Sequence, residues 1–266
     1  MERTRLDKLL VDRGCAPTRQ KAQAMILAGE VFVDGRRVDK PGTPIPSAAP
    51  LEIRSGRRIR VGRAGEKLEA ALERFGLAVE GRLALDIGAS VGGFTECLLN
   101  RGASRVIALD VGKGQLDQSL RGDPRVRILD GMNARYLRPG DLSPDEAALD
   151  LIVCDVSFIS LRLILPAVAR VLTRGDAVVL VKPQFEAGRG KVGKGGVVRD
   201  PKLHREAIEQ VLSEAQAIGF DPAGVIRSPI RGPAGNVEFL AWLRLEHDPS
   251  RDVSNAINDA ISASLA

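Results

Sequence analysis

The chain has 266 residues, of which 44% are hydrophobic and 27% are charged, a balance that suits one large folded domain, alone or beside a small one. It contains no run of about 18 apolar residues, so we expect no membrane-spanning helix and no membrane partner. Its charged N-terminus lacks the apolar stretch of a signal peptide, and its three widely spaced cysteines indicate neither a disulfide framework nor a metal site. We therefore expect a cytoplasmic protein.

The net charge of +5 is unevenly distributed along the chain. Residues 1–64 hold 14 Lys and Arg against 7 Asp and Glu, whereas the remaining residues hold 25 against 27. Such asymmetry predicts that the N-terminal part contacts a polyanion, although a solvated basic surface gives the same count.

The first 54 residues have the pattern of a small domain with two helices and a short sheet. Apolar residues at helical spacing predict helices over residues 5–11 and 18–28. Asp34-Gly35 predicts a hairpin turn, and residues 51–53 a last short strand. We therefore expect a small α+β domain over residues 1–54, followed by a basic linker over residues 55–64.

Several short motifs in this region match those of a known module. They are Arg5-Leu6-Asp7, Thr18-Arg19, Ala22, Gly29-Glu30-Val31, Val33-Asp34-Gly35 and Lys40-Pro41-Gly42. On these residues the region resembles an S4 RNA-binding domain, although Thr18 and Asp34 stand where the family more often has Ser and Asn. The resemblance implies phosphate contacts with structured RNA from Arg5, Arg19, Lys21, Arg36 and Arg37. Each of these taken alone also fits an ordinary surface charge.

From residue 65 onward, apolar strand-like segments alternate with helical ones. Strands are predicted at residues 83–87, 106–110, 126–129, 149–155, 177–181, 225–227 and 238–245, and helices at residues 66–75, 94–100, 160–172 and 201–218. This alternation predicts an α/β fold with a parallel sheet, whose ligands bind at the carboxyl ends of the strands. We expect this domain over residues 65–248 and a C-terminal tail over residues 249–266.

A glycine-rich turn, Asp86-Ile-Gly88-Ala-Ser90-Val-Gly92-Gly93-Phe94, follows the first of these strands. Its glycines do not have the Gly-x-Gly-x-x-Gly spacing of dinucleotide-binding folds. Asp110 ends the next strand, 24 residues after Asp86, where an acid can bind ribose hydroxyls.

Together with two polar residues after the third strand, these features resemble the S-adenosylmethionine (SAM) site of class I, Rossmann-like methyltransferases. The resemblance implies SAM as cofactor and a binding site made of Asp86, Gly88, Ser90, Gly92, Gly93, Phe94, Asp110, Asp130 and Asn133. A tight strand-to-helix turn without a ligand is the alternative.

Four charged residues stand out at the ends of predicted elements. Lys67 opens the helix before the first strand, Asp155 and Lys182 end the fourth and fifth strands, and Glu238 starts a late strand. Because an unpaired buried charge is costly, a lysine after an apolar strand needs partners, and Asp155 and Glu238 are available. In this order the four resemble the Lys-Asp-Lys-Glu tetrad of FtsJ-type ribose 2′-O-methyltransferases.

The tetrad implies a role for each of its members. Lys182 orients the ribose 2′-hydroxyl, while Asp155 and Glu238 hold the two lysines. The sequence leaves open whether Lys182 also accepts the hydroxyl proton, because burial and the adjacent carboxylates act in opposite directions on its basicity. Lys67 orients the hydroxyl or stabilises developing negative charge. Two structural salt bridges are the alternative.

Longer motifs extend the resemblance over residues 3–245. They include Arg63-Ala64-Gly65-Glu66-Lys67-Leu68, Asp110-Val111-Gly112-Lys113-Gly114-Gln115-Leu116, Asp155-Val156-Ser157-Phe158-Ile159-Ser160-Leu161, Lys182-Pro183-Gln184-Phe185-Glu186 and Gly195-Gly196-Val197-Val198-Arg199-Asp200. The chain as a whole resembles the TlyA family, although Val91 and Ala64 replace the usual Thr and Gly. The resemblance implies methylation of cytidine 2′-hydroxyls in ribosomal RNA of one or both subunits.

Other functions stay open at this point. Some TlyA family members are described as haemolysins, but the sequence has no long amphipathic segment beyond ordinary helices. The fold also suits an RNA-binding protein without methyl transfer, or a methyltransferase acting on a protein or small molecule. Aromatic residues are few, and Phe158 and Phe185 are the candidates for stacking on a flipped base, if they are not core.

Residues 188–195, Gly-Arg-Gly-Lys-Val-Gly-Lys-Gly, come close to a nucleotide-binding P-loop. Gly195 stands where that motif has a hydroxyl, and the next predicted helix starts only near residue 201. We therefore interpret residues 185–199 as a basic flap in which Arg189, Lys191 and Lys194 meet RNA phosphates. An ordinary surface loop is the alternative.

Overall fold

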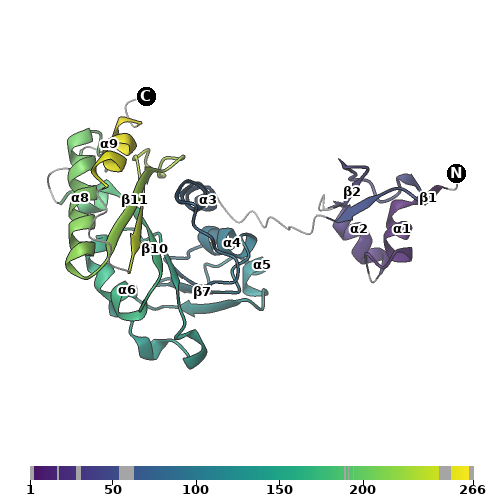
Figure 1. Cartoon of the computed structure of the whole chain (residues 1–266), viewed down its shortest axis with the longest axis horizontal. Helices are drawn as coiled ribbons and strands as arrows, with labels where there is room; N and C mark the ends of the chain where they lie inside the picture. Colours follow the sequence, from purple (N-terminus) through teal and green to yellow (C-terminus); the bar gives the residue numbers. More distant parts are fainter. Residues whose placement is uncertain are drawn as a thin grey trace. The chain divides into compact units, whose positions relative to one another are not determined.

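The computed structural model describes residues 3–16, 18–27, 31–53, 63–188, 190, 192–193, 195–245 and 253–263. The chain divides into two compact units, Met1–Arg58 and Ile59–Ala266, whose elements are drawn in Figure 1.

The N-terminal unit combines two short helices with two small sheets. Its helices are α1 (Leu6–Asp12) and α2 (Arg19–Leu27), and its strands are β1 (Arg3–Arg5), β2 (Val31–Val33), β3 (Arg36–Arg37), β4 (Pro44–Pro46) and β5 (Leu51–Ile53). Strand β2 pairs antiparallel with β3 and β5, and β1 pairs antiparallel with β4. Asp34 and Gly35 both have positive φ, as a tight hairpin turn requires, so the predicted hairpin is present.

A separate small core holds this unit together. It is made of apolar side chains from both helices, from β2 and β4, and from neighbouring loops. Its buried members include Leu6, Leu9, Leu10, Ala22, Ile26, Val31, Val33 and Ile45. The unit therefore has its own apolar interior, as an independent domain needs.

A seven-stranded sheet in the order β11-β12-β10-β9-β6-β7-β8 forms the centre of the C-terminal unit, among the residues that the structure describes. The strands are β6 (Leu83–Ile87), β7 (Arg105–Asp110), β8 (Val126–Asp130), β9 (Leu151–Cys154), β10 (Asp176–Val181), β11 (Asp221–Arg227) and β12 (Phe239–Arg244). Neighbours from β8 to β10 are parallel, whereas β12 runs antiparallel to both β10 and β11. The predicted α/β fold with a largely parallel sheet is confirmed.

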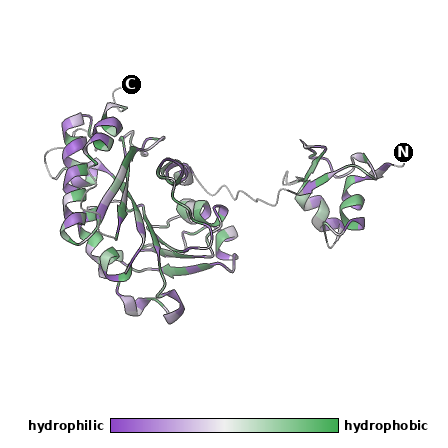
Figure 2. Cartoon of the chain, viewed as in Figure 1, coloured by the Kyte–Doolittle hydropathy of each residue, from purple (hydrophilic) through white to green (hydrophobic). Residues whose placement is uncertain are grey.

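Helices cover both faces of this sheet, and the strands at its centre are the most apolar part of the unit (Figure 2). One face packs on α3 (Ala64–Phe75), α4 (Gly93–Asn100) and α5 (Gln118–Arg121), and the other on α6 (Leu165–Val171), α8 (Pro201–Ala217) and α9 (Ser254–Ser262). Side chains alternate along β7, with Val106 and Ala108 on the first face and Ile107 and Leu109 on the second. Both faces are therefore buried, as in other parallel sheets.

Two segments differ from the sequence-based expectation. The single helix expected over residues 160–172 is divided into a 3₁₀ turn, η4 (Leu161–Leu163), and α6, because Pro166 fits only the first turn of a helix. Within the expected C-terminal tail, α9 buries Ile257, Ala260 and Ile261 in the core. Short helices also occur at η1 (Ala134–Tyr136), η2 (Pro139–Asp141), η3 (Pro144–Glu146) and α7 (Pro183–Glu186).

Candidate active site

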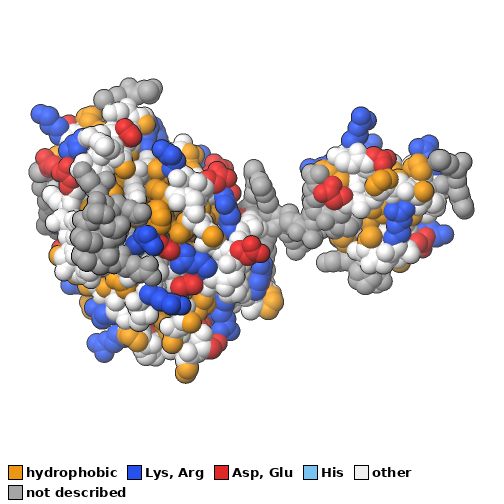
Figure 3. Space-filling view, viewed as in Figure 1, with side chains coloured by type: hydrophobic (Ala, Val, Ile, Leu, Met, Phe, Trp, Pro, Cys, Tyr) orange, Lys and Arg blue, Asp and Glu red, His pale blue; other side chains and the backbone are white. Residues whose placement is uncertain are grey.

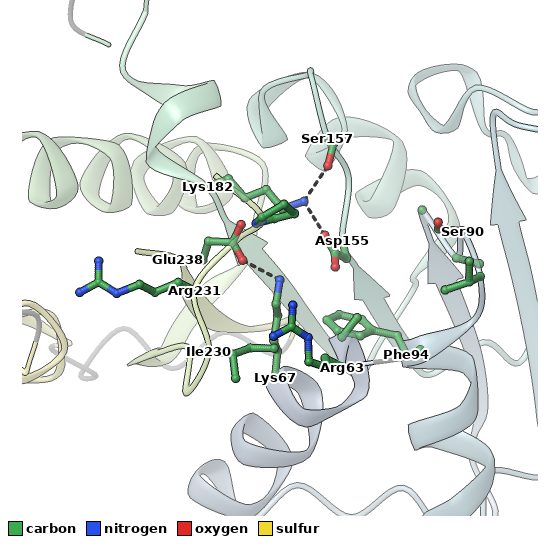
Figure 4. Close-up of a pocket in the computed structure, with 16 residues that line it drawn as sticks. Arg63, Lys67, Ser90, Phe94, Asp155, Ser157, Lys182, Ile230, Arg231 and Glu238 are labelled. Carbon is green, nitrogen blue, oxygen red and sulfur yellow. Dashed lines mark hydrogen bonds and ion pairs between the residues drawn. The ribbon is translucent and has the colours of Figure 1, made fainter. Parts of the chain in front are cut away.

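Two adjoining pockets lie at the carboxyl ends of the central strands, in the C-terminal unit. The first, which we call the tetrad pocket, has a volume of about 320 Å³ and is lined by Arg63, Lys67, Phe94, Asp155, Lys182, Arg231 and Glu238, among others (Figure 4). The second, the strand-end pocket, has about 540 Å³ and is lined by Asp110, Val111, Met132, Asn133 and Phe158, among others. The two pockets adjoin, because they share four lining residues: Gly88, Ser90, Asp155 and Ser157.

The tetrad pocket contains two lysine–carboxylate ion pairs. Lys182 Nζ lies 2.6 Å from Asp155 Oδ1, and Lys67 Nζ donates a 2.6 Å hydrogen bond to Glu238 Oε2. The exposed fraction of the side chain is 9% for Lys182, 8% for Lys67 and 1% for Glu238. Ions this deeply buried are held only when each has a partner, so the pairs keep both lysines in the pocket.

A third group, the Ser157 hydroxyl, completes the surroundings of Lys182. Lys182 Nζ donates a 2.8 Å hydrogen bond to Ser157 Oγ, in addition to its contact with Asp155 (Figure 4). A tetrahedral nitrogen has three positions besides its carbon, so two acceptors leave one position for another molecule.

Close backbone approaches bring these elements together. Gly88 has a φ of 84°, and a Cβ atom there would lie 2.4 Å from the carbonyl oxygen of Asp155. A Cβ at Gly232 would lie 2.4 Å from Glu238 Oε1. Only glycine allows the turn after β6 to touch the end of β9, whereas a side chain at Gly232 would require the Glu238 carboxylate to move.

The structure brings six of the nine predicted cofactor residues to the two pockets. Gly88, Ser90, Gly93, Phe94, Asp110 and Asn133 all line one or both. The Asp110 carboxylate accepts hydrogen bonds from the amides of Ser90 (2.8 Å) and Gly112 (2.7 Å). Each of its oxygens keeps a second lone pair, which leaves it able to accept from a ligand hydroxyl.

The other three residues predicted for the cofactor lie outside the lining of both pockets. Asp86 is fully buried and accepts a 2.7 Å hydrogen bond from Thr95 Oγ1. Asp130 accepts a 2.8 Å hydrogen bond from the amide of Gly114. A Cβ at Gly92 would collide with Leu120, so this glycine permits packing beneath the turn. These three shape the turns that line the site.

Burial changes the acidity of Asp86. Removal from water raises its pKa to about 7, the nearby charges of Asp155 and Asp110 act in the same direction, and the Thr95 hydrogen bonds oppose the shift. The carboxyl that precedes the glycine turn is therefore protonated over part of the physiological pH range.

The predicted RNA-binding residues have different surroundings. Arg5 and Arg19 both form ion pairs with Asp7, and Arg36 and Arg37 are exposed on β3. Lys21 belongs to α2, but its side chain is not among those described, and Arg189, Lys191 and Lys194 of the predicted flap also lie outside the described residues.

Three polar residues of the tetrad pocket were not predicted as site residues from the sequence. They are Ser157, which bonds to Lys182, and two exposed arginines, Arg63 and Arg231. The spacing Asp155-x-Ser157 after a strand is a signal for the first, since both side chains then follow the same strand end. Arg231 has no such signal, because it lies inside the loop between β11 and β12 and does not directly follow a strand.

Phe158 is the most exposed large apolar side chain reported for the described residues. Its exposed fraction is 91%, its φ is 64°, and its ring centroid lies 5.3 Å from that of Phe185. A non-glycine residue rarely adopts a positive φ unless its surroundings impose it. Phe158 is therefore presented at the rim of the strand-end pocket and is not part of the core.

The strand order, the glycine turn after β6 and the paired lysines beside a strand-end pocket together define a class I methyltransferase. Residues 60–245 match the family model described as FtsJ-like methyltransferase, and residues 4–48 match the S4 domain. In the part of the chain that the structure describes, no helix is long and apolar enough to cross a membrane.

Similar proteins cover almost the whole chain. It is 47% identical to the 16S/23S rRNA (cytidine-2′-O)-methyltransferase TlyA of Mycobacterium tuberculosis, over 98% of each chain. It is 44% identical to a protein named Hemolysin A from Brachyspira hyodysenteriae, over 89% of this chain and 98% of that one. A solved structure described as a candidate hemolysin from Streptococcus thermophilus matches with a TM-score of 0.74 and 42% identity, over 100% of this chain and 96% of the other. The chain belongs to the TlyA family of FtsJ-like methyltransferases.

Proposed function

We propose that the protein methylates the ribose 2′-hydroxyl of cytidine in ribosomal RNA, with SAM as the methyl donor. The observation that carries this proposal is the convergence of two buried lysine–carboxylate pairs beside the strand-end pocket. The name of the Mycobacterium tuberculosis relative supports both the reaction and the nucleotide. Ribosomal RNA as substrate fits a cytoplasmic protein.

The strand-end pocket has hydrogen-bonding and apolar groups that suit SAM. Asp110 keeps free lone pairs for the ribose diol, and Asn133 offers a side-chain amide beside it. Val111, which is 70% exposed, and Met132 provide apolar surface for the adenine. When bound, SAM would supply a methyl group on a positively charged sulfur, and Gly88 and Ser90, which line both pockets, would contact both the cofactor and the substrate.

Lys182 orients the substrate hydroxyl and accepts its proton. Asp155 and Ser157 accept from two of the three positions around Lys182 Nζ, which leaves the third position for the ribose hydroxyl. With SAM bound, the ribose oxygen would form its bond to the methyl carbon as the bond between that carbon and sulfur breaks, and the hydroxyl proton would leave toward Lys182. Holding the hydroxyl in line with the methyl group supplies much of the rate enhancement.

The second ion pair and the two arginines act on the rest of the nucleotide. Lys67, fixed by Glu238, stabilises the negative charge that develops on the ribose oxygen. A 2′-hydroxyl is next to the 3′-phosphate of the same nucleotide, so Arg63 and Arg231 at this pocket are placed to neutralise backbone phosphates. Phe158 offers its exposed ring for stacking by the target base, with Phe185 beside it.

The N-terminal part supplies affinity for ribosomal RNA. We assign this role to a domain over residues 1–54, joined by a basic linker over residues 55–64 to a catalytic domain over residues 65–248. Arg5, Arg19, Lys21, Arg36 and Arg37 bind phosphates from the first domain, and Arg189, Lys191 and Lys194 bind them from the flap. The net positive charge of residues 1–64 favours the approach of this part of the chain to a polyanion.

The test is methyl transfer from labelled SAM to unmodified small and large ribosomal subunits, with Lys182→Ala in parallel. We expect label on a cytidine 2′-oxygen, and a loss of at least about 100-fold in kcat/KM for the variant, because a positioned proton acceptor contributes 10²–10⁴. Lys202→Ala, at an exposed lysine of α8, is the control and keeps full activity. Label in a base or in protein contradicts the proposed reaction, and full activity of Lys182→Ala contradicts the role of the lysine.

A further inference from the structure

Asp7 of the N-terminal unit is a fully buried carboxylate at the start of α1. Its oxygens accept hydrogen bonds from Arg5 Nε (3.1 Å) and Nη2 (3.0 Å), from Arg19 Nε (3.0 Å), from Gln23 Nε2 (2.8 Å) and from the amide of Lys8 (2.9 Å). The hydrogen bond from Arg5 is the largest influence holding the pKa of Asp7 far below its ordinary value, although burial acts in the opposite direction. The carboxylate is therefore ionised and saturated with donors.

The two arginines that Asp7 holds are themselves exposed. The exposed fraction of the side chain is 52% for Arg5 and 56% for Arg19, against 0% for Asp7. One negative charge thus faces two positive charges, so that the cluster keeps a net positive charge at the surface.

The geometry places both guanidinium groups side by side. Arg5 Nη2 and Arg19 Nε each lie 3.0 Å from the same oxygen of Asp7, so these nitrogens are at most twice that distance apart. Arg5 presents two of its nitrogens to Asp7, and Arg19 only one, which leaves N–H groups of both pointing away from the carboxylate. A Cβ at Gly42 would lie 3.2 Å from Arg5 Nη1, so the Arg5 guanidinium is also confined on that side.

Other arginines of the same unit lack this arrangement. Arg36 and Arg37 are exposed on β3, and no ion pair of theirs occurs among the described residues. On the face that Figure 3 shows, the Lys and Arg side chains of this unit stand in separate places and form no continuous patch. A local, fixed pair of guanidinium groups is therefore a distinct feature of this surface.

We propose that Asp7 positions Arg5 and Arg19, two of the arginines assigned above to RNA phosphates, as a preorganised fork that binds a single backbone phosphate. Two adjacent guanidinium groups match the oxygens of a phosphate, and their mutual repulsion is offset by the buried carboxylate beneath them. Fixing both side chains before binding removes the entropy that two free arginines lose on contact. Asp7 is a positioning residue in this arrangement, and the identity of the RNA rests on the proposed function.

The fork and the net charge predict opposite effects of Asp7→Asn on RNA affinity. Asp7→Asn adds one positive charge to the domain, so a general electrostatic attraction predicts tighter RNA binding. The fork predicts weaker binding, because the arginines lose the group that orients them. Asp12→Asn is the matched control, since Asp12 is exposed on the same helix and its replacement changes the charge equally.

The experiment measures equilibrium binding of the full chain to unmodified ribosomal subunits over a series of salt concentrations. We expect Asp7→Asn to raise Kd at least about tenfold and to lower the salt slope by about one phosphate contact, whereas Asp12→Asn binds as tightly as the parent or tighter. Equal binding by the two variants overturns the fork. Absence of binding by the parent protein itself contradicts the proposed function instead.

A second pair of variants covers a loss of folding in Asp7→Asn, which circular dichroism of the full chain detects. Arg5→Lys with Arg19→Lys keeps both charges but removes the planar groups, and Arg36→Lys with Arg37→Lys is its control. We expect at least about fivefold weaker binding for the first pair alone, from the loss of bidentate contacts. Indistinguishable affinities for the two pairs overturn the fork.

Discussion

At the scale of single residues, two buried ion pairs, Lys182 with Asp155 and Lys67 with Glu238, bring four charged residues together in the tetrad pocket. The sequence indicates these residues, because a charge at the end of a strand or helix destabilises a core unless it has a partner. Ser157 was not predicted, because a serine is compatible with any turn and its importance comes only from its 2.8 Å contact with Lys182. Asp130 is expected to contact the cofactor, and the structure adds that its carboxylate accepts a hydrogen bond from the Gly114 amide.

The Ser157 hydroxyl carries a prediction at this scale. Ser157→Ala removes one of the two acceptors that orient Lys182 Nζ, so we expect about a tenfold lower kcat with little change in the KM for ribosomal subunits. Ser157→Thr keeps the hydroxyl and restores most of the activity. The check is steady-state methyl transfer for the three proteins, and an effect on KM alone would show that Ser157 serves substrate binding.

At the scale of elements, hydrophobic patterns located the central strands within one or two residues. Strand β11 was predicted only over residues 225–227, because Pro222 and Gly224 interrupt its apolar pattern. At the edge of the sheet these residues are tolerated through a register shift between them. The position of β12 between β10 and β11 has no local signal, since strand order depends on contacts between distant segments.

The contact between the β6 turn and the end of β9 leads to a prediction about cofactor binding. Gly88→Ala places a methyl group 2.4 Å from the Asp155 carbonyl oxygen, which forces the turn away from the strand. We expect the Kd for SAM, measured by isothermal titration calorimetry, to rise at least about tenfold. This corresponds to a loss of about 1.4 kcal/mol or more of binding free energy.

Gly81→Ala is the matched control for this prediction. Gly81 has a similar φ of 75°, but a Cβ atom there meets nothing within 4 Å. It therefore carries the same backbone strain of about 1–2 kcal/mol without the collision. If both variants bind SAM equally well, the close approach of the turn to Asp155 does not matter for the cofactor site.

At the scale of the whole molecule, stability and site are connected through Asp86. Its carboxyl is protonated up to about pH 7 in the folded chain, whereas the ordinary value for aspartate is 3.8. Between these values the unfolded chain binds fewer protons than the folded one, so the free energy of unfolding falls as the pH rises, and it levels off above about pH 7. The slope from this one group is at most about 1.4 kcal/mol per pH unit.

Asp86→Asn removes this titration and is expected to flatten the curve between pH 5 and 7, leaving the variant relatively more stable at pH 8. Urea unfolding followed by the fluorescence of Trp242 checks this, because the chain has one tryptophan and it lies in β12 of the large unit. Asp259→Asn, at an exposed carboxyl of α9, serves as the control. A parent protein whose stability does not fall over this range relative to Asp86→Asn contradicts the assignment.

The sequence by itself determined the two units, the largely parallel sheet and the types of residue at its carboxyl edge, because apolar periodicity and charged strand ends are local properties of the chain. Only the tertiary structure decided which charges meet. Lys67 pairs with Glu238 across 171 positions of sequence because antiparallel β12 follows the loop that covers the pocket, leaving Asp155 to Lys182. The tertiary structure also decided that burial of Asp7 and of Asp86 has opposite results for their pKa values. Five donors surround Asp7 and lower its pKa, whereas Thr95 is the hydrogen-bond partner of Asp86, whose pKa is raised. Burial favours the neutral acid unless donors outweigh it, and donors come from the whole fold.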